Sequence, residues 1–306
     1  MNLFSEFISQ NQEIELPLFL AKKVRVSIKR EDVFDEFVSG NKLRKLKYNL
    51  LAAKTKKCNT LLTFGGAYSN HIAAVAKAGK LLDFETIGVV RGDELADKIE
   101  ENSTLRFAQS CGMKFEFVSR ELYRERNDPE YIDELQEKHP NTYIIPEGGT
   151  NKEAIKGCEE ILTKRDEDFS HIAVAVGTGG TLAGIVNCSK LGQQVLGFPA
   201  LKGNFLQTDI SKFTKKQNWC LVPDYHFGGY AKIDESLIRF INQFKKDTKI
   251  ALDPVYTGKM MFGIINMIKN DQFKPGDSIL TIHTGGLQGI NGMNKLLRKK
   301  SMIEIK

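Results

Sequence analysis

The chain has 306 residues, with 44 Lys and Arg against 38 Asp and Glu and a formal net charge of +6. Its length exceeds the roughly 100 to 200 residues of one ordinary domain, so the sequence predicts two domains. The modest positive charge has no interleaved aromatic residues or finger motif beside it, which argues against a nucleic-acid-binding protein and leaves anionic small molecules as partners.

Short apolar segments alternate with helical patterns along the chain, which is typical of an α/β protein whose mostly parallel sheet is covered on both faces. Apolar residues at helical spacing predict helices over 42–54, 71–82 and 181–191. The predicted strands cover 24–28, 60–63, 86–90, 114–118, 143–145, 172–176, 194–197 and 278–283.

The first candidate site residue is Lys42, which follows Gly40 and Asn41 at the start of a predicted helix. A lysine becomes a Schiff-base nucleophile when burial, a neighbouring cation or a helix N-terminus lowers its pKa. Arg44 and Lys45 are candidate cationic neighbours. Most lysines lie on the surface, so this turn alone leaves both interpretations open.

The segment 64–71 reads Phe-Gly-Gly-Ala-Tyr-Ser-Asn-His and precedes the second predicted helix. Ser69, Asn70 and the loop amides are suited to bind a carboxylate at the helix N-terminus. The alternative is an N-capped helix in which Ser69 or Asn70 is the cap. The two roles are compatible.

A glycine-rich loop lies between a predicted strand and the third predicted helix, where backbone N–H groups form an anion site. It contains Gly177, Thr178, Gly179, Gly180 and Thr181. No Gly-Lys-Ser/Thr follows, and the third glycine of a dinucleotide fingerprint is replaced by Leu182. A monophosphate is the anion that remains, with a structural turn as the alternative.

Two further motifs follow near the end of the chain. Residues 253–259 read Asp-Pro-Val-Tyr-Thr-Gly-Lys, and residues 283–286 read His-Thr-Gly-Gly at the end of a predicted strand. Open α/β sheets place ligands at the carboxyl ends of their strands. If Tyr256 only packed in the core, its hydroxyl would still need a partner.

The cysteines have neither a Cys-x-x-Cys pair nor a histidine at metal-ligand spacing, which predicts reduced core thiols and no metal site. The N-terminus lacks a secretory pattern and no run of 18 apolar residues occurs, so a cytoplasmic protein without a membrane span is expected. The cysteines are Cys58, Cys111, Cys158, Cys188 and Cys220.

Together with Lys-Arg-Glu-Asp at 29–32, these motifs resemble, in this order along nearly the whole chain, the 1-aminocyclopropane-1-carboxylate deaminase and D-cysteine desulfhydrase family. The resemblance implies a pyridoxal 5'-phosphate enzyme of fold type II, with two open, twisted, mostly parallel sheets flanked by helices. It also implies a large cofactor-binding domain of residues 1–45 and 151–306, a small domain of 46–150, an active site between them and a homodimer.

The resemblance further implies which residues bind the cofactor. By motif position Lys42 is the Schiff-base lysine and proton carrier, and Lys45 assists the 177–181 loop at the phosphate. Asn70 matches the family residue that bonds the ring hydroxyl of the cofactor. Thr284 is expected at the pyridine nitrogen.

Substrate contacts follow from the same resemblance. Ser69 and the amides of Asn70 and His71 are expected to bind the substrate carboxylate. Tyr256 matches the active-site tyrosine beside the substrate, and Tyr230 is the candidate for a second family tyrosine.

The resemblance also bears on the choice of substrate, a small amino acid. Family members that open the cyclopropane ring carry Glu after the tyrosine and Leu before the last Gly-Gly, where this chain has Thr257 and Thr284. Thr257 is therefore a candidate substrate contact. The prediction is α,β-elimination of D-cysteine to pyruvate, ammonia and sulfide. Ring-opening deamination is the first alternative, and a non-catalytic metabolite-binding protein is the second.

Overall fold

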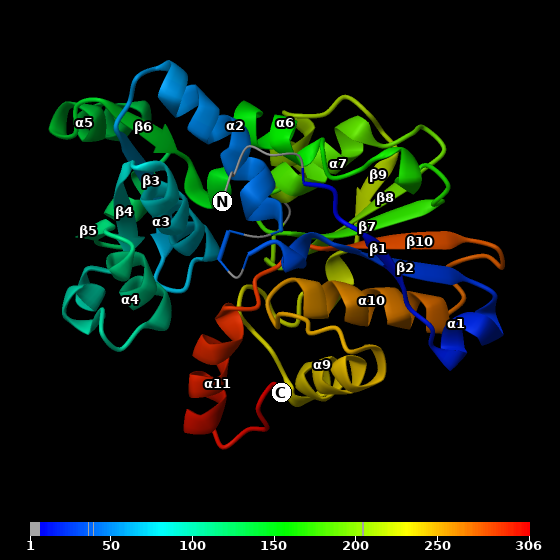
Figure 1. Cartoon of the computed structure of the whole chain (residues 1–306). Coiled ribbons are helices and arrows are strands. Elements are labelled where there is room, and N and C mark those ends of the chain that lie inside the picture. The colour runs from blue at the N-terminus through cyan, green and yellow to red at the C-terminus, as the bar shows by residue number, and fades with distance from the viewer. Residues whose placement is uncertain (1–6, 36, 39, 204) are drawn as a thin grey trace. The chain divides into compact units, whose positions relative to one another are not determined.

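The computed structural model describes residues 7–35, 37–38, 40–203 and 205–306, and strands and helices alternate within them (Figure 1). The strands are β1 (Asn11–Glu13), β2 (Arg25–Arg30), β3 (Thr60–Gly66), β4 (Glu85–Arg91), β5 (Lys114–Val118), β6 (Thr142–Ile145), β7 (His171–Val176), β8 (Gln194–Pro199), β9 (Trp219–Leu221) and β10 (Ser278–His283). The helices are α1 (Pro17–Lys22), α2 (Asn41–Thr55), α3 (Asn70–Leu82), α4 (Ser103–Ser110), α5 (Pro129–Lys138), α6 (Lys152–Cys158), α7 (Gly180–Cys188), α8 (Phe205–Ser211), α9 (Glu235–Thr248), α10 (Thr257–Lys269) and α11 (Gly289–Lys299).

The chain divides into two compact units. The small unit is Lys42–Gly157, and the large unit joins residues 7–41 to Cys158–Lys306. The divisions follow Asn41 and Gly157, whereas the sequence suggested 45 and 150. Lys42 and Lys45 therefore belong to the small unit.

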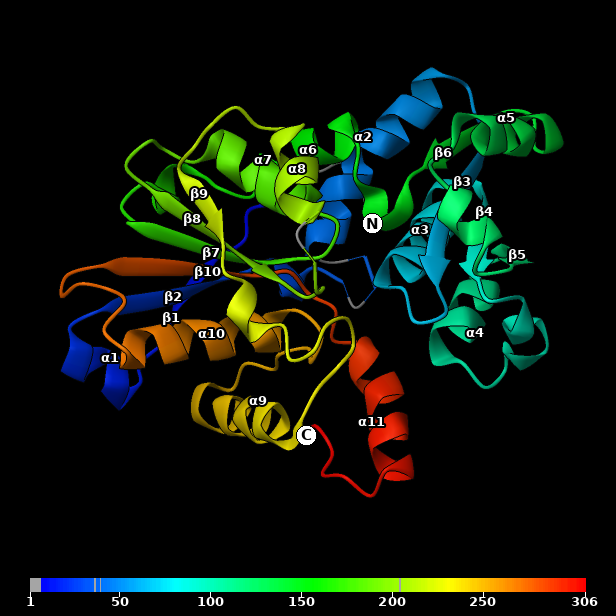
Figure 2. The same cartoon turned by 180° about the vertical axis from the view of Figure 1, so that it is seen from behind.

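The large unit contains a six-stranded sheet, in the described residues, with the order β1-β2-β10-β7-β8-β9. Within the described residues of this sheet, only the edge pair β1 and β2 is antiparallel, and the other pairs are parallel. Helices α9 and α10 cover one face and α7 and α8 the other (Figures 1 and 2). All six residues of β10 are buried, as expected for a parallel strand between two helical layers.

The small unit contains a four-stranded parallel sheet, in the described residues, with the order β5-β4-β3-β6. On one face Leu62, Phe64 and Val89 pack against Tyr131 and Leu135 of α5. Helix α3 packs against the other face, where the small size of Gly65 and Gly88 admits Ile72. The α/β class with two mostly parallel sheets flanked by helices is thus confirmed.

Each predicted strand is present within a few residues, but the structure corrects the third predicted helix. That helix ends at Cys188 rather than at residue 191, because Ser189 leaves the helical conformation as its C-cap. Leu191 is 84% exposed, so it contributes nothing to the apolar face that the sequence pattern suggested.

The cysteine prediction is wrong for four positions. Cys158 is buried, but Cys58, Cys111 and Cys188 are only partly buried, and Cys220 is exposed. The scattered spacing of the cysteines predicts that they form no disulfide framework, but it does not predict how deeply each one is buried. All five are free thiols.

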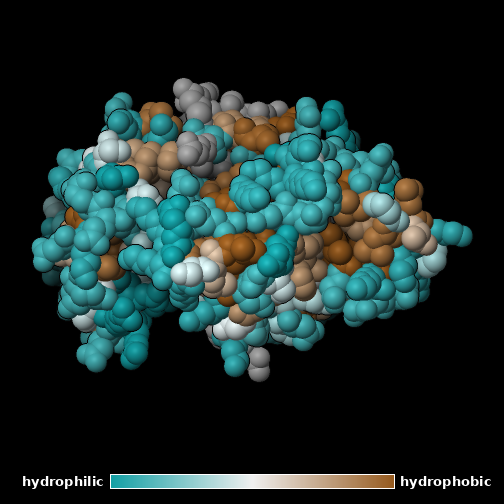
Figure 3. All heavy atoms as spheres, turned by 90° about the horizontal axis from the view of Figure 1, so that it is seen from below, coloured by the Kyte–Doolittle hydropathy of each residue, from teal (hydrophilic) through white to brown (hydrophobic). Residues whose placement is uncertain are grey.

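No helix in the described part of the chain combines the length and the apolar character that crossing a membrane requires. Residues 7–35, 37–38, 40–203 and 205–306 also contain no group of His, Cys, Asp and Glu suited to bind a metal ion. Figure 3 shows one face on which polar side chains predominate, with apolar patches between them.

Candidate active site

The sequence motifs of the large unit lie at one edge of its sheet. Strand β7 ends just before loop 177–181, and β10 ends just before Thr284. Because β10 is parallel to both β2 and β7, the carboxyl ends of these strands lie along the same edge. This is the edge at which open α/β sheets bind ligands.

Loop 177–181 has the form of an anion cradle. Gly179 is the N-cap of α7 with φ +87°, and no side chain of the described residues caps this helix. A Cβ added to Gly179 would lie 2.5 Å from Cγ1 of Ile210, and one added to Gly177 would lie 3.3 Å from the ring of Tyr256. The amides of the first turn, without a side-chain cap, fit a phosphate group.

The turn that precedes Lys42 packs against this edge. Gly40 has φ +58°, and a Cβ there would lie 2.0 Å from the carbonyl oxygen of Thr284. The side-chain amide of Asn41 donates a 2.9 Å hydrogen bond to Oγ1 of Thr181. The residue bonded to Lys42 is therefore anchored to the predicted phosphate loop.

His283 fixes the loop that carries Thr284. Its Nε2 lies 2.7 Å from the carbonyl oxygen of Ala251, and Nδ1 accepts a 3.2 Å hydrogen bond from the amide of Gly285. A carbonyl oxygen only accepts, so the contact with Ala251 places a proton on Nε2, while Nδ1 also lies 3.6 Å from Oδ1 of Asp32. The motif His-Thr-Gly-Gly in the sequence does not predict this role of His283.

Asp253 orders the turn before α10. Its carboxylate accepts hydrogen bonds from the amides of Val255, Tyr256 and Thr257 at 2.7 to 2.9 Å. The ring of Tyr256 then makes a T-shaped contact with Tyr230, with the ring centroids 6.3 Å apart. The structure therefore brings the two predicted tyrosines together in the large unit.

Thr257, predicted as a substrate contact, is bonded to Asp253 in this structure. Its side chain is fully buried, and its hydroxyl donates to Asp253 Oδ1 at 2.7 Å and accepts from the Asp253 amide at 2.9 Å. This hydroxyl has one lone pair left, and the fully buried side chain would have to become accessible for a substrate to reach it. The sequence alone does not show that Thr257 bonds to Asp253, because a threonine hydroxyl can bond equally well to a nearby residue or to a substrate.

In the small unit, Ser69 is the N-cap of α3. Its Oγ accepts hydrogen bonds from the amides of His71 at 3.2 Å and Ile72 at 3.3 Å. The capping interpretation is thus present in this structure. These bonds are long for N–H···O contacts, so a carboxylate at the same helix terminus can compete for them.

Lys45 and His71 lie near each other behind this helix terminus. Lys45 Nζ donates to the carbonyl oxygen of Gly148 at 2.9 Å and to Oγ1 of Thr150 at 3.1 Å. A Cβ added to Gly149 would lie 2.9 Å from Cε1 of His71 and 3.6 Å from Cδ of Lys45. Glycine at 149 is therefore required for this packing.

The imidazole of His71 was not predicted, because only its backbone amide had been considered. It is 2% exposed, and both ring nitrogens are buried without a hydrogen-bond partner within the described residues. Burial, together with the charges of Lys42 and Lys45, holds the pKa of His71 well below its ordinary value. A neutral imidazole with unsatisfied nitrogens is typical of a position that a ligand or an ordered water completes.

The low pKa of His71 predicts an acid-sensitive fold. The unfolded chain takes up a proton at this residue near pH 6.5 while the folded chain does not, so the free energy of unfolding falls as the pH drops below 6.5. The slope from one such group is at most about 1.4 kcal/mol per pH unit. Urea titrations at pH 7.5 and 5.5 should show a smaller acid loss in His71→Gln than in the wild type. Equal losses would contradict the buried neutral imidazole.

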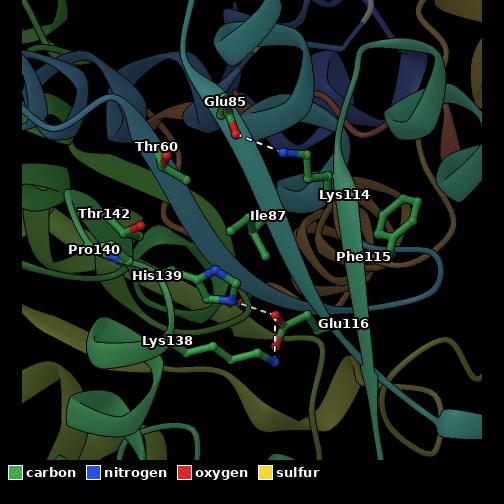
Figure 4. Close-up of a pocket in the computed structure, with 10 residues that line it drawn as sticks. All are labelled: Thr60, Glu85, Ile87, Lys114, Phe115, Glu116, Lys138, His139, Pro140 and Thr142. Carbon is green, nitrogen blue, oxygen red and sulfur yellow. Dashed lines mark hydrogen bonds and ion pairs between the residues drawn. The ribbon is translucent and has the colours of Figure 1, made fainter.

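A separate pocket of about 300 Å³ lies in the small unit (Figure 4). Four of its lining residues are the first residues of the four strands, so it lies at the amino edge of the sheet, opposite the motif-bearing edge. Glu116 pairs there with Lys138 at 2.9 Å and with His139. The pocket therefore does not belong to the site predicted from the motifs. The four first residues are Thr60, Glu85, Lys114 and Thr142.

The family model of pyridoxal-phosphate-dependent enzymes matches residues 7–285. The chain belongs to this family. The cofactor of this family is pyridoxal 5'-phosphate. The uncapped glycine cradle at 177–181 fits the phosphate group of this cofactor.

Similar proteins narrow the family further. A Pyrococcus furiosus protein provisionally named 1-aminocyclopropane-1-carboxylate deaminase is 33% identical, over 86% of this chain and 85% of that protein. The Arabidopsis thaliana bifunctional D-cysteine desulfhydrase/1-aminocyclopropane-1-carboxylate deaminase, a mitochondrial protein, is 32% identical over 86% of this chain and 72% of its own length. A crystal structure of an ACC deaminase homologue superposes with a TM-score of 0.79 and 28% identity, covering 96% of this chain and 94% of the other. This pyridoxal-phosphate enzyme therefore lies in the deaminase and desulfhydrase branch.

Proposed function

We propose that this enzyme catalyses α,β-elimination on a small amino acid, with D-cysteine as the preferred substrate and pyruvate, ammonia and sulfide as products. The observation that carries the proposal is the pair of threonines at the two discriminating positions. Thr257 is held by Asp253, and Thr284 follows β10. Thr257 stands where ring-opening family members carry the Glu carboxylate, and Thr284 stands where they carry Leu.

The bound cofactor supplies an electron sink for the electron pair left when the α-proton is removed. We propose that Lys42 removes this proton. The Cβ–S bond then breaks and its electron pair leaves on sulfur as thiolate. Water hydrolyses the enamine product to pyruvate and ammonia. Tyr256, ordered by Asp253, is proposed to orient the substrate.

The remaining chain groups are proposed to bind and orient. The amides of loop 177–181 and the ammonium of Lys45 hold the phosphate. Asn70 bonds the ring hydroxyl of the cofactor, and Thr284 bonds its pyridine nitrogen. Ser69 releases the helix amides of α3 to the substrate carboxylate.

The physical argument for D-cysteine rests on the pyridine nitrogen. A carboxylate there stabilises the protonated ring and makes it a full electron sink, whereas the hydroxyl of Thr284 carries no charge. A thiol ionises near pH 8.5, so thiolate is a good leaving group and needs a weaker sink. The carbon leaving group of the cyclopropane substrate needs the stronger one.

The test is the product released by cofactor-loaded enzyme from D-cysteine, L-cysteine and 1-aminocyclopropane-1-carboxylate. We expect pyruvate and sulfide from D-cysteine, with kcat/KM at least about tenfold above either competitor, a difference of about 1.4 kcal/mol in transition-state binding. Production of 2-oxobutyrate from the cyclopropane substrate alone would favour deamination, the activity also named for the Arabidopsis relative.

We further propose that the enzyme is a cytoplasmic homodimer. The chain mass is 34.4 kDa. Sedimentation equilibrium of the cofactor-loaded enzyme should therefore give twice this mass.

A further inference from the structure

Helix α10 contains a buried lysine to which no role has been assigned. Lys259 is 2% exposed. Its Nζ donates to the carbonyl oxygen of His226 at 2.9 Å and to that of Gly229 at 2.8 Å. Lysines are almost never fully buried unless they are paired, and here the two backbone carbonyls are the partners that compensate for the burial of the ammonium group.

The segment that Lys259 contacts, loop 226–231, has an unusual backbone. Phe227 and Ala231 both have φ +54°, and the two glycines between them have φ +88° and +117°. Left-handed conformations at non-glycine residues are uncommon, and they persist only where the surrounding structure enforces them. Lys259 binds two carbonyls of this loop and thereby supplies such a constraint.

The loop is also closed by its own hydrogen bonds. The amide of Gly228 donates to Nδ1 of His226 at 2.9 Å, and the amide of Gly229 donates to the carbonyl oxygen of His226 at 3.0 Å. The amide of Lys232 donates to the carbonyl oxygen of Gly229 at 3.1 Å. These three amides report directly on whether the loop is closed.

The loop contains Tyr230 and places its ring beside that of Tyr256. Tyr230 is 45% exposed, so its own burial does little to hold it in place. Tyr230 is part of this loop, so a change in the loop backbone moves its ring relative to Tyr256. Tyr256 in turn lies over Gly177 of the predicted phosphate loop.

We propose that Lys259 is a positioning residue that clamps loop 226–231 and so holds Tyr230 beside Tyr256. The consequence for catalysis rests on the proposed function. The clamp itself rests on the hydrogen bonds and the loop conformation and is testable without turnover.

The clamp weakens at alkaline pH. Burial lowers the pKa of Lys259 to about 8, although the carboxylate of Asp253 opposes this shift. Other ionisable groups on the neighbouring segments include Asp224, Tyr225, His226, Tyr230 and Lys232, together with Lys202, whose Cβ lies near Gly229. Loss of the ammonium charge leaves neutral hydrogen bonds, which are roughly half as strong as charge-assisted ones.

The experiment is hydrogen–deuterium exchange of the holoenzyme in Lys259→Met. We expect the amides of Gly228, Gly229 and Lys232 to exchange at least about tenfold faster than in the wild type, since local opening controls their exchange. The amides of β10 serve as the internal reference for global unfolding. Lys269→Met, an exposed lysine on the same helix, is the matched control and should leave the three amides unchanged.

A second measurement uses the wild-type enzyme and therefore needs no substitution in the protein core. In the wild-type holoenzyme, protection of the three amides relative to β10, corrected for intrinsic exchange, should fall between pH 7 and 9. Unchanged protection in both Lys259→Met and the alkaline wild type would overturn the clamp, whatever the substrate.

Kinetics separate the clamp from the proposed function. If Tyr230 contacts the substrate, Lys259→Met should raise KM for D-cysteine by a larger factor than it lowers kcat. If the three amides lose protection while kcat and KM stay unchanged, the proposed role of Lys259 in holding the loop stands, and Tyr230 is not a substrate contact.

Discussion

Replacing Lys42 with alanine is expected to lower kcat on D-cysteine by about 10²–10⁴-fold or more, because the variant lacks the group proposed to remove the α-proton. The same change removes the covalent link to the cofactor. Dialysis should therefore strip the cofactor absorbance from Lys42→Ala but not from the wild type. Steady-state pyruvate release and the visible spectrum measure the two effects independently.

The matched control is Lys54→Ala. Lys54 is exposed and lies on the same helix, so its removal changes the helix charge equally without touching the start of α2. Its kcat and its spectrum should equal those of the wild type. Activity of Lys42→Ala within tenfold of the wild type would exclude Lys42 as the proton carrier.

Substituting Gly40 by alanine is expected to lower the free energy of unfolding by at least about 2 kcal/mol. The left-handed φ of +58° costs any residue with a Cβ roughly 1–2 kcal/mol, and a backbone overlap adds to it. The new Cβ would lie 2.0 Å from the Thr284 carbonyl oxygen, so the loop at 284–286 must move. Cofactor affinity should fall together with stability.

Gly112 supplies a control that isolates backbone strain from steric overlap. It has φ +93°, and a Cβ there would meet no atom within 4 Å. Urea denaturation of Gly40→Ala and Gly112→Ala in the presence of the cofactor should show a clearly larger loss for Gly40→Ala. Equal losses of unfolding free energy in the two variants would mean that the overlap with Thr284 adds nothing to the cost of Gly40→Ala.

Much of the fold followed from the sequence because several strands, such as β3 and β7, are largely apolar runs. Burial on both faces of such a strand removes the alternation of polar and apolar residues. Strand β1 was missed for the opposite reason. Its residues Asn11–Glu13 are polar, and it lies at the edge of the sheet, where Asn11 donates a 2.7 Å hydrogen bond to Asp166.

The candidate site was predictable wherever glycine was required. The cradle at 177–181 and the turn at Gly40 stand out in the sequence because their conformations or close contacts tolerate no side chain. The polar groups were harder to assign. The hydroxyls of Ser69 and Thr257 bond to their own backbone region here, and sequence spacing cannot distinguish that from contact with a ligand.

The burial of charged and titratable groups was the property that could least be predicted from the sequence. Lys29 and Asp166 form a 2.8 Å ion pair in which both side chains are 1% exposed, although 137 residues separate them in the chain. Lys259 and His71 are buried in the same way. No local pattern separates these residues from exposed lysines and histidines, because tertiary packing decides their surroundings.

The most direct test of Lys42 as the active-site lysine is to reduce the cofactor-loaded enzyme with borohydride and to map the labelled lysine by peptide mass spectrometry. We predict a stable cofactor adduct on Lys42 alone. An adduct on Lys45, Lys259 or any other lysine, with Lys42 unmodified, would contradict the assignment of the active-site lysine and the mechanism built on it.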